Sequence, residues 1–269
     1  MNWNWTLLDA GRFKLDGGSM FGVVPKGLWS RFCKPDEHNC LPYCCNCVLL
    51  EKDEKRILIE SGYGVGWSDK EKQMFGMDES TILTALVGAG IEPDSIDTLI
   101  LSHLHFDHAA GATLLPNAQV VVQKQEWEDA LANRSTMSKT YLPRVLESIK
   151  DRVELVEGKT LYADGITLTP RIGHTWGIQS IEVETDGGTL CFASDLIPDH
   201  HHVGLAFSMG YDMLPWDNKM TKQSFLEEAY ADSWTLVLCH DITHPVVRVI
   251  KNEKNAFALE PVTDFSRNQ

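Results

Sequence analysis

The segment His103-Leu104-His105-Phe106-Asp107-His108 constrains this chain more than any other feature, because it places four metal-ligating side chains within six positions. The residues before it, 97–101, are mostly apolar or β-branched and predict a buried strand. The small residues after it, 109–115, predict a loop and a short helix. We therefore expect a metal site at the carboxyl end of a strand, where α/β sheets keep their ligand sites.

Three further residues of metal-binding type occur in the second half of the chain. His174 and Asp195 each come shortly after a predicted strand, and His240 ends another. A catalytic zinc usually takes three protein ligands plus water, so ligands from outside the hexapeptide are required. Strands that each end in such a residue predict a site built along the rim of a sheet.

Apolar periodicity predicts alternating strands and helices along the chain. The expected strands are 45–51, 56–60, 97–101, 119–122, 153–156, 166–170, 179–184, 189–193 and 234–239. The expected helices are one capped by Asp78 and ending at Gly88 or Gly90, followed by 125–132, 142–150 and 222–231. No linker divides the halves, which predicts one α/β domain, residues 1–269, with two sheets packed between outer helices.

The charge balance of the chain argues against nucleic acid as a partner. The sequence has 24 Lys and Arg against 38 Asp and Glu, a net charge of −14, and no local basic strip. Such a chain repels phosphate backbones. No apolar run approaches the roughly 18 residues of a membrane span, and residues 1–5 lack the basic start of a signal peptide. We expect a soluble, cytoplasmic protein without a membrane partner.

Cysteine usage predicts reduced thiols. The chain has seven cysteines, an odd number, and five of them lie at Cys33, Cys40, Cys44, Cys45 and Cys47. An odd count without a secretion signal favours free thiols over a disulfide framework. Packing is the favoured role of this cluster, and a separate zinc site made of Cys33, His38, Cys40 and Cys44 is the alternative.

The motifs together resemble those of the metallo-β-lactamase superfamily over nearly the whole chain. The resemblance consists of the H-x-H-x-D-H segment, Gly-His-Thr at 173–175, Ser-Asp at 194–195 after a strand, and the strand-terminal His240. Within the superfamily the sequence is most similar to quorum-quenching lactonases that open N-acyl-homoserine lactones. The segments that carry this likeness are 16–26 followed by 28–30, 62–64, 102–109, 195–198 with His202, and 209–212. The resemblance implies an αββα sandwich of two mixed β-sheets flanked by helices.

The resemblance also implies two metal ions, with zinc preferred and iron, manganese or cobalt as alternatives. His103, His105 and His174 would hold the first ion, Asp107, His108 and His240 the second, and Asp195 would bridge them. A hydroxide held between the metals would attack the ester carbon. Asp107 would then pass a proton to the departing alkoxide.

The sequence departs from the family pattern at three places. Glu60-Ser61-Gly62 stands where many relatives have Asp-Thr-Gly, and Ile178 stands where a second His often follows Gly-His-Thr. Pro198 occupies the position of a Tyr that steadies the lactone carbonyl in some lactonases, so Tyr211, His201 and His202 are the candidates for this role. The predicted substrate-binding residues are Met20, Phe21, His202, Phe207 and Met209, and the predicted catalytic residues are Asp107 and Tyr211.

Other functions remain open at this point. The same metal core would suit hydrolysis of aryl esters, organophosphate triesters or β-lactams. A non-catalytic metal-binding module is the alternative from another class. Since such lactonases are often dimers, a homodimer is an open prediction. The preferred hypothesis is a metal-dependent hydrolase of a small-molecule carboxylic ester, with an N-acyl-homoserine lactone as the first-ranked substrate.

Overall fold

Two seven-stranded sheets form the centre of the molecule. The computed structural model describes residues 2–137 and 139–268. The first sheet contains, in spatial order, β14 (Arg267–Asn268), β1 (Asn4–Asp16), β2 (Cys40–Lys52), β3 (Lys55–Ile59), β4 (Thr98–Ile100), β5 (Gln119–Gln123) and β6 (Val153–Val156). The second contains β13 (Phe257–Pro261), β12 (Val246–Lys251), β11 (Thr235–Val237), β10 (Gly188–Phe192), β9 (Gln179–Thr185), β8 (Ile166–Pro170) and β7 (Thr160–Ala163).

Both sheets mix parallel and antiparallel pairs. In the first sheet β3, β4, β5 and β6 run parallel to one another and β14 is parallel to β1, whereas the β1–β2 and β2–β3 pairs are antiparallel. In the second sheet β10 and β11 are parallel and the other neighbours are antiparallel. Parallel strands end at the same edge of a sheet, and the predicted ligands follow the ends of β4, β8, β10 and β11. The topology therefore brings these residues to one edge of the two sheets.

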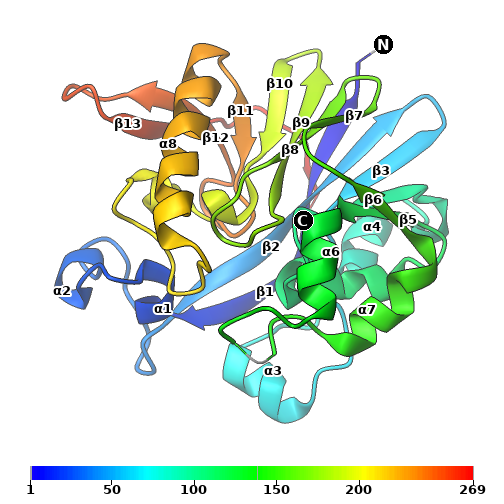
Figure 1. The fold of residues 1–269 in the computed structure, drawn as a ribbon, viewed down its shortest axis with the longest axis horizontal. Coiled ribbons are helices and arrows are strands. Elements are labelled where there is room, and N and C mark those ends of the chain that lie inside the picture. The colour runs from blue at the N-terminus through cyan, green and yellow to red at the C-terminus, as the bar shows by residue number, and fades with distance from the viewer. Residues whose placement is uncertain (1, 138, 269) are drawn as a thin grey trace.

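Helices cover the outer faces of both sheets (Figure 1). The α-helices are α1 (Gly17–Phe21), α2 (Lys26–Trp29), α3 (Asp69–Phe75), α4 (Ile82–Gly88), α5 (Phe106–Ala109), α6 (Lys124–Leu131), α7 (Pro143–Ile149) and α8 (Pro215–Ala231). Short 3₁₀ helices are η1 (Pro93–Ser95), η2 (Ala110–Leu114), η3 (Lys150–Arg152), η4 (Ser194–Leu196) and η5 (His200–Val203). The predicted αββα sandwich is confirmed.

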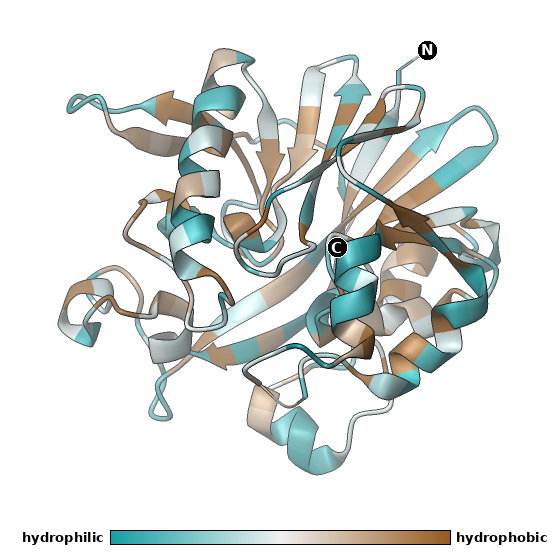
Figure 2. Ribbon diagram, in the orientation of Figure 1, coloured by the Kyte–Doolittle hydropathy of each residue, from teal (hydrophilic) through white to brown (hydrophobic). Residues whose placement is uncertain are grey.

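Strand alternation explains how the core is divided. Ile57 and Ile59 of β3 point between the sheets, whereas Leu58 points outward under the helices. The outer face of the second sheet packs on α8 through Phe225 and Leu226. Because both faces of the central strands are buried, their sequences read as continuous apolar runs, which appear brown in Figure 2.

Several elements differ from the predictions. β1, β7, β12, β13 and α3 were not predicted. In β1 the side-chain alternation is interrupted by a register shift between Asp9 and Arg12, where Gly11 has a φ of 129°. Helix α8 begins at Pro215 rather than at residue 222, because proline fits the first helical turn.

The predicted helix cap at Asp78 is wrong. Thr81 caps α4 and forms a capping box with Thr84. The Asp78 carboxylate instead accepts hydrogen bonds from the Tyr63 hydroxyl and the Arg12 backbone N–H. It therefore ties the loop before α4 to β1.

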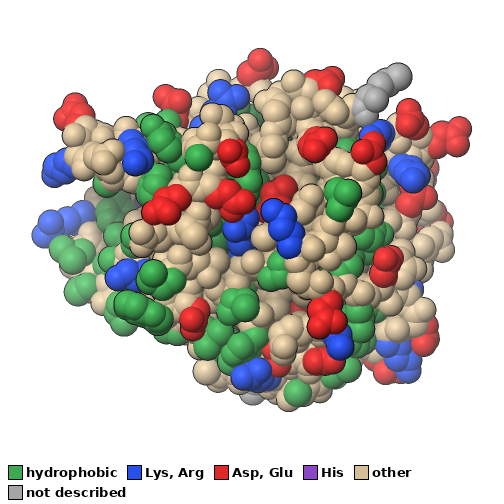
Figure 3. All heavy atoms as spheres, turned by 45° about the horizontal axis from the view of Figure 1, so that its top comes forward, with side chains coloured by type: hydrophobic (Ala, Val, Ile, Leu, Met, Phe, Trp, Pro, Cys, Tyr) green, Lys and Arg blue, Asp and Glu red, His purple; other side chains and the backbone are tan. Residues whose placement is uncertain are grey.

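The outer surface carries both kinds of charge. Acidic and basic side chains are interspersed on the face shown in Figure 3. None of the helices in the described part of the chain has the length and apolar character needed to cross a bilayer.

Candidate metal centre

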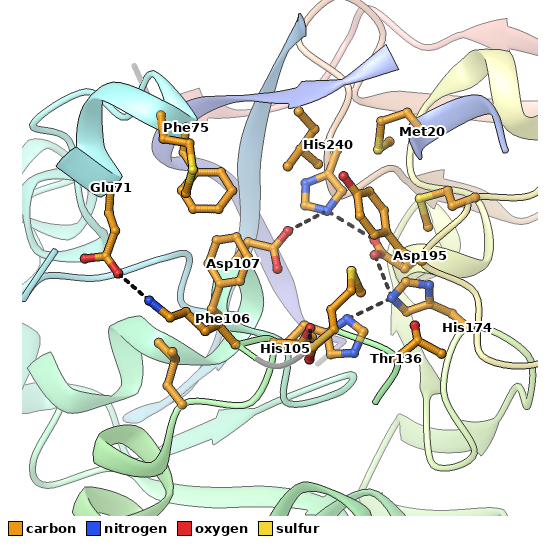
Figure 4. A pocket seen from close by; sticks show the side chains of 18 of the residues that line it. Met20, Glu71, Phe75, His105, Phe106, Asp107, Thr136, His174, Asp195 and His240 are labelled. Carbon is orange, nitrogen blue, oxygen red and sulfur yellow. Dashed lines mark hydrogen bonds and ion pairs between the residues drawn. The ribbon is translucent and has the colours of Figure 1, made fainter. Parts of the chain in front are cut away.

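The predicted ligands converge at one edge of the two sheets. His103 and His105 lie in the loop after β4, and α5 carries Asp107 and His108. The other three lie after strands of the second sheet: His174 after β8, Asp195 in η4 after β10, and His240 after β11. The ligands labelled in Figure 4 point toward one another across this edge.

One group of ligand atoms contains His103, His105, His174 and Asp195, with all four atoms within 4.8 Å of one another. His174 Nε2 lies 2.9 Å from His105 Nδ1 and 3.1 Å from Asp195 Oδ2. His103 Nε2 lies 4.0 Å from the same Asp195 oxygen. These are the residues that the resemblance assigned to the first metal, together with the proposed bridging carboxylate.

A second group contains His108, Asp195, Cys239 and His240, whose ligand atoms also all lie within 4.8 Å of one another. Asp195 Oδ1 lies 3.2 Å from His240 Nε2 and 3.5 Å from His108 Nε2. The two oxygens of Asp195 therefore face different groups, as a bridging carboxylate would require.

Asp107 and Cys239 differ from the expected ligand pattern. Asp107 Oδ2 lies 3.5 Å from His240 Nε2 and 3.9 Å from His108 Nε2, beside the second group rather than within it. Cys239, which was predicted only as a strand residue, is a member of that group. Its position directly before His240 was the one available signal in the sequence.

Four ligand imidazoles are held by a partner on their other ring nitrogen. His240 Nδ1 lies 2.8 Å from the carbonyl oxygen of Cys44, and His174 Nδ1 lies 2.9 Å from Asp212 Oδ1. His103 Nδ1 lies 3.0 Å from the Ser102 hydroxyl. His108 Nδ1 lies 3.3 Å from Glu60 Oε2. Such partners fix the ring so that Nε2 faces a metal.

The residues present fit divalent cations. His103 Nε2 and His108 Nε2 are buried and have no hydrogen-bond partner within residues 2–137 and 139–268. Buried polar atoms are normally satisfied, so unpartnered nitrogens that face a carboxylate are suitably placed to bind a cation. Burial, and next the neighbouring His108 or His174, hold the pKa of His103 and of His105 well below its usual value. Neutral imidazole is the metal-binding form, and imidazole with carboxylate suits zinc and similar ions.

Glu60 takes the supporting position that an Asp has in many relatives. Its buried carboxylate accepts a hydrogen bond from the Ser102 backbone N–H at 2.8 Å and reaches His108. Its backbone has a φ of 67°, which is strained for a non-glycine residue. The Ser61 hydroxyl donates to the carbonyl of His108 at 2.8 Å. Support from behind the ligands therefore comes from a side chain one methylene longer than Asp.

Glu126 connects the two loops that carry the first ligand group, and sequence reasoning missed it. Its side chain is fully buried in α6. The carboxylate accepts hydrogen bonds from the Leu104 N–H at 3.0 Å, the Tyr141 hydroxyl at 3.1 Å and the Thr175 hydroxyl at 2.6 Å. Nothing in its local sequence, Gln-Glu-Trp-Glu, distinguishes it from an exposed helical glutamate.

A cavity of about 480 Å³ opens onto the ligands. His105, Asp107, His174, Asp195 and His240 form its floor. Its apolar walls are Leu15, Met20, Trp67, Met74, Phe75, Phe106, Met137, Leu142 and Met209. The remaining lining residues are Glu71, Thr136, Lys139, Thr140 and Tyr211. Lys139 Nζ lies 3.6 Å from Glu71 Oε1, and Glu71 is on the side of the cavity away from His174 and Asp195 (Figure 4).

The predicted substrate residues divide into two sets. Met20, Met209 and Tyr211 line the cavity, whereas Phe21, Phe207 and His202 do not. These three pack together instead, since the Phe21 ring stacks on His202 at 5.1 Å and lies 6.0 Å from the Phe207 ring.

The predicted contact of His202 with substrate is therefore corrected. His202 is fully buried, and its ring nitrogens bond to Asp199 Oδ1 at 2.7 Å and to the Met20 carbonyl at 2.8 Å. It positions Met20 rather than facing the cavity. The prediction missed Trp67 and Phe75 because α3 and the loop before it were not predicted.

The cysteine cluster is divided between core and surface. Cys44, Cys45 and Cys47 are buried in β2, as packing residues would be, and Cys33 and Cys40 are partly exposed. Within the described residues, the alternative zinc ligands Cys33, His38, Cys40 and Cys44 form no mutual ligand group.

The geometry defines a candidate site for divalent cations at the edge of an αββα sandwich, and the sequence around it matches a known family. The family model described as the Metallo-beta-lactamase superfamily matches residues 42–240. The chain belongs to the metallo-β-lactamase superfamily.

The individual proteins and structures that resemble this chain include lactonases and a metal-dependent hydrolase. An N-acyl homoserine lactonase of Bacillus thuringiensis is 32% identical over 190 residues, covering 66% of this chain and 69% of that protein. The structure of a probable metal-dependent hydrolase from Staphylococcus aureus matches with a TM-score of 0.87 and 28% identity, covering 97% and 98% of the two chains. An N-acyl homoserine lactone hydrolase, solved with N-hexanoyl-L-homoserine bound at its catalytic metal centre, matches with a TM-score of 0.71 and 25% identity, covering 90% and 95%. The chain is thus a superfamily hydrolase that resembles lactonases.

Proposed function

We propose that residues 1–269 form one hydrolase domain that opens a lactone of the N-acyl-homoserine class at a centre of two divalent cations, preferably zinc. The observation that carries this proposal is Asp195, whose oxygens face two separate ligand groups on the floor of an apolar cavity. The likeness to a hydrolase with an acyl-homoserine product at its metal centre supports the substrate class.

His103, His105 and His174 would hold one cation, Asp107, His108 and His240 the other, and Asp195 both. When bound, such a pair lowers the pKa of water toward about 7 and polarises an ester carbonyl. Both effects favour attack of water on the carbonyl carbon at neutral pH.

Asp107 is placed to move a proton. Its carboxylate lines the cavity, beside His240 and away from the buried side of the centre. Ring opening leaves an alkoxide that must gain a proton, and a carboxyl group within reach can deliver it. Tyr211 also lines the cavity, and its hydroxyl is the group we assign to steady the lactone carbonyl, since Pro198 cannot.

The cavity walls match an acyl tail. Trp67, Phe75 and Phe106 lie next to one another, with ring centroids 5.2 to 6.3 Å apart. All three line the cavity, and Phe75 and Phe106 lie on its side away from His174 (Figure 4). An apolar wall of this kind gains from burying methylene groups, at about 0.8 kcal/mol each. The polar lactone ring would then lie at the cations and the tail against these rings.

The test is metal analysis followed by a substrate panel: homoserine lactones of increasing acyl length, γ-lactones, aryl esters, phosphotriesters and β-lactams. We expect two cations per chain and the highest kcat/KM on acyl-homoserine lactones, rising with tail length. Comparable weak turnover of every class would contradict the lactone assignment and leave a general hydrolase. Bound metal without any turnover would favour the non-catalytic module.

A further inference from the structure

The second ligand group contains a thiol that the family pattern did not predict. Cys239 Sγ lies 3.1 Å from Asp195 Oδ1, and its side chain is 1% exposed. Its ligand atom and those of His108, Asp195 and His240 all lie within 4.8 Å of one another. A buried cysteine alone would indicate only packing, but this one faces a carboxylate together with the unpartnered His108 Nε2.

The spacing of these atoms matches the edges of a coordination polyhedron. Zinc lies about 2.0–2.3 Å from nitrogen, oxygen and sulfur ligands, so neighbouring atoms of a tetrahedral site are about 3.3–3.6 Å apart. Measured from Asp195 Oδ1, the separations are 3.1 Å to Cys239 Sγ, 3.2 Å to His240 Nε2 and 3.5 Å to His108 Nε2. All three are close to that range.

Cys239 and Asp107 approach the group from different sides. Asp107 lines the cavity, whereas Cys239 does not and packs with the residues between the two sheets. A thiolate on the buried side would complete the ligand set from behind. Asp107 would stay on the open side, where its carboxylate lines the cavity.

We propose that Cys239 is a ligand of the second cation, as a thiolate that joins His108, His240 and Asp195. Cation binding would break the S–H bond, form a metal–sulfur bond and release one proton to solvent. The second position would consequently prefer thiophilic ions such as Zn²⁺ or Co²⁺ over Mn²⁺. This inference rests on the proposed dinuclear site and goes beyond it by assigning a further ligand.

The test uses Co²⁺, whose bond to thiolate gives a near-ultraviolet charge-transfer band. Metal-stripped wild-type protein is titrated with Co²⁺ beside Cys239→Ser and Cys191→Ser. Cys191 is a fully buried cysteine of β10 that belongs to neither ligand group, so its variant is the matched control. We expect two bound Co²⁺ and the band in wild type and Cys191→Ser. Cys239→Ser should lose the band and bind the second Co²⁺ roughly 10-fold or more weakly.

Two results would overturn the ligand assignment while leaving the dinuclear site intact: two bound Co²⁺ without the band, or a band that persists in Cys239→Ser. Fewer than two Co²⁺ per wild-type chain would contradict the dinuclear site itself. Should Cys239→Ser fail to fold, X-ray absorption of the zinc-loaded wild type decides the matter. The assignment requires a sulfur neighbour at about 2.3 Å from zinc, and a purely nitrogen and oxygen shell would refute it.

Discussion

At the scale of single residues, the side chains of the candidate metal centre could be proposed from the sequence, whereas most of the side chains that support them could not. Four of the predicted ligands lie within one hexapeptide, whose spacing is itself informative. Glu126 and Asp212 support the ligands through contacts with residues 22 and 38 positions away, respectively. Such contacts come from the packing of distant elements, and no local pattern encodes them.

Replacing Glu126 should loosen the first ligand group. The carboxylate accepts three hydrogen bonds, whereas the amide of Glu126→Gln keeps only one acceptor oxygen, so at least one of these buried bonds must reverse or break. We expect a loss of about 1–3 kcal/mol in unfolding free energy and about 10–100-fold weaker metal binding. Denaturation and chelator competition measure these quantities. Glu128→Gln, an exposed change on the same helix, is the control, and equal behaviour of the two variants would refute the role.

Glu60 offers a second test at this scale. Glu60→Asp shortens the side chain by one methylene, so its carboxylate can no longer reach both Ser102 and His108 from the same backbone. We expect weaker binding of the second cation, by about 10-fold or more, with smaller change at the first. Calorimetric titration of the two sites measures this, and unchanged affinity at both would show that Glu60 serves the fold alone.

At the scale of elements, the buried strands were predicted best. Their apolar runs are unambiguous because both faces are covered. β1 was not predicted because its register shifts near Gly11, which interrupts the alternation of apolar and polar residues. α3 was not predicted because none of its residues is buried, so it has no apolar face to recognise. The walls of the cavity come partly from α3, so the substrate contacts were predicted less well than the metal ligands.

The loop after β8 packs so closely on α6 at Gly177 that no room remains there for a side chain. A Cβ at Gly177 would lie 2.2 Å from the Glu126 backbone nitrogen. We expect Gly177→Ala to lower the unfolding free energy by about 1–3 kcal/mol through overpacking. Gly187→Ala, whose Cβ would meet nothing closer than 3.7 Å, should stay within about 0.5 kcal/mol of wild type. Thermal or urea denaturation compares them, and a neutral Gly177→Ala would contradict the packing.

Helix α8 is joined to the loop at 202–207 by a buried lysine. Lys222 donates to the carbonyls of His202 and Phe207, and burial lowers its pKa from 10.5 to about 8. Between these values the unfolded chain holds a proton that the folded chain has released, so stability rises with pH. Below about pH 8 Lys222 is protonated in both the folded and the unfolded chain, and the folded state bears the full cost of burying its charge.

We therefore expect the unfolding free energy of wild type, relative to Lys222→Met, to increase by up to about 3 kcal/mol as pH rises from 8 to 10.5. Urea denaturation of the metal-free proteins across this range measures the difference. A difference that does not vary with pH would mean that Lys222 stays protonated in the folded state.

At the scale of the whole molecule, the cations should stabilise the fold that gathers their ligands. The two sheets contribute ligands from opposite halves of the chain, and the unfolded chain cannot reproduce this arrangement. A ligand at a hundredfold excess over its Kd adds about 2.7 kcal/mol per site. Chelation should lower the Tm of wild type and leave that of Asp195→Asn nearly unchanged. An unchanged wild-type Tm would contradict coupling between metal and fold, and equal shifts in both proteins would mean that Asp195 is not needed to bind the cations.

The central claim is that Asp195 lies between two cations. Anomalous X-ray scattering from crystals of the zinc-loaded protein, collected on both sides of the zinc edge, locates the ions directly. The account predicts two peaks about 3.5–4 Å apart, one beside His103, His105 and His174 and the other beside His108 and His240. A single peak, or two peaks that do not share Asp195, would contradict it.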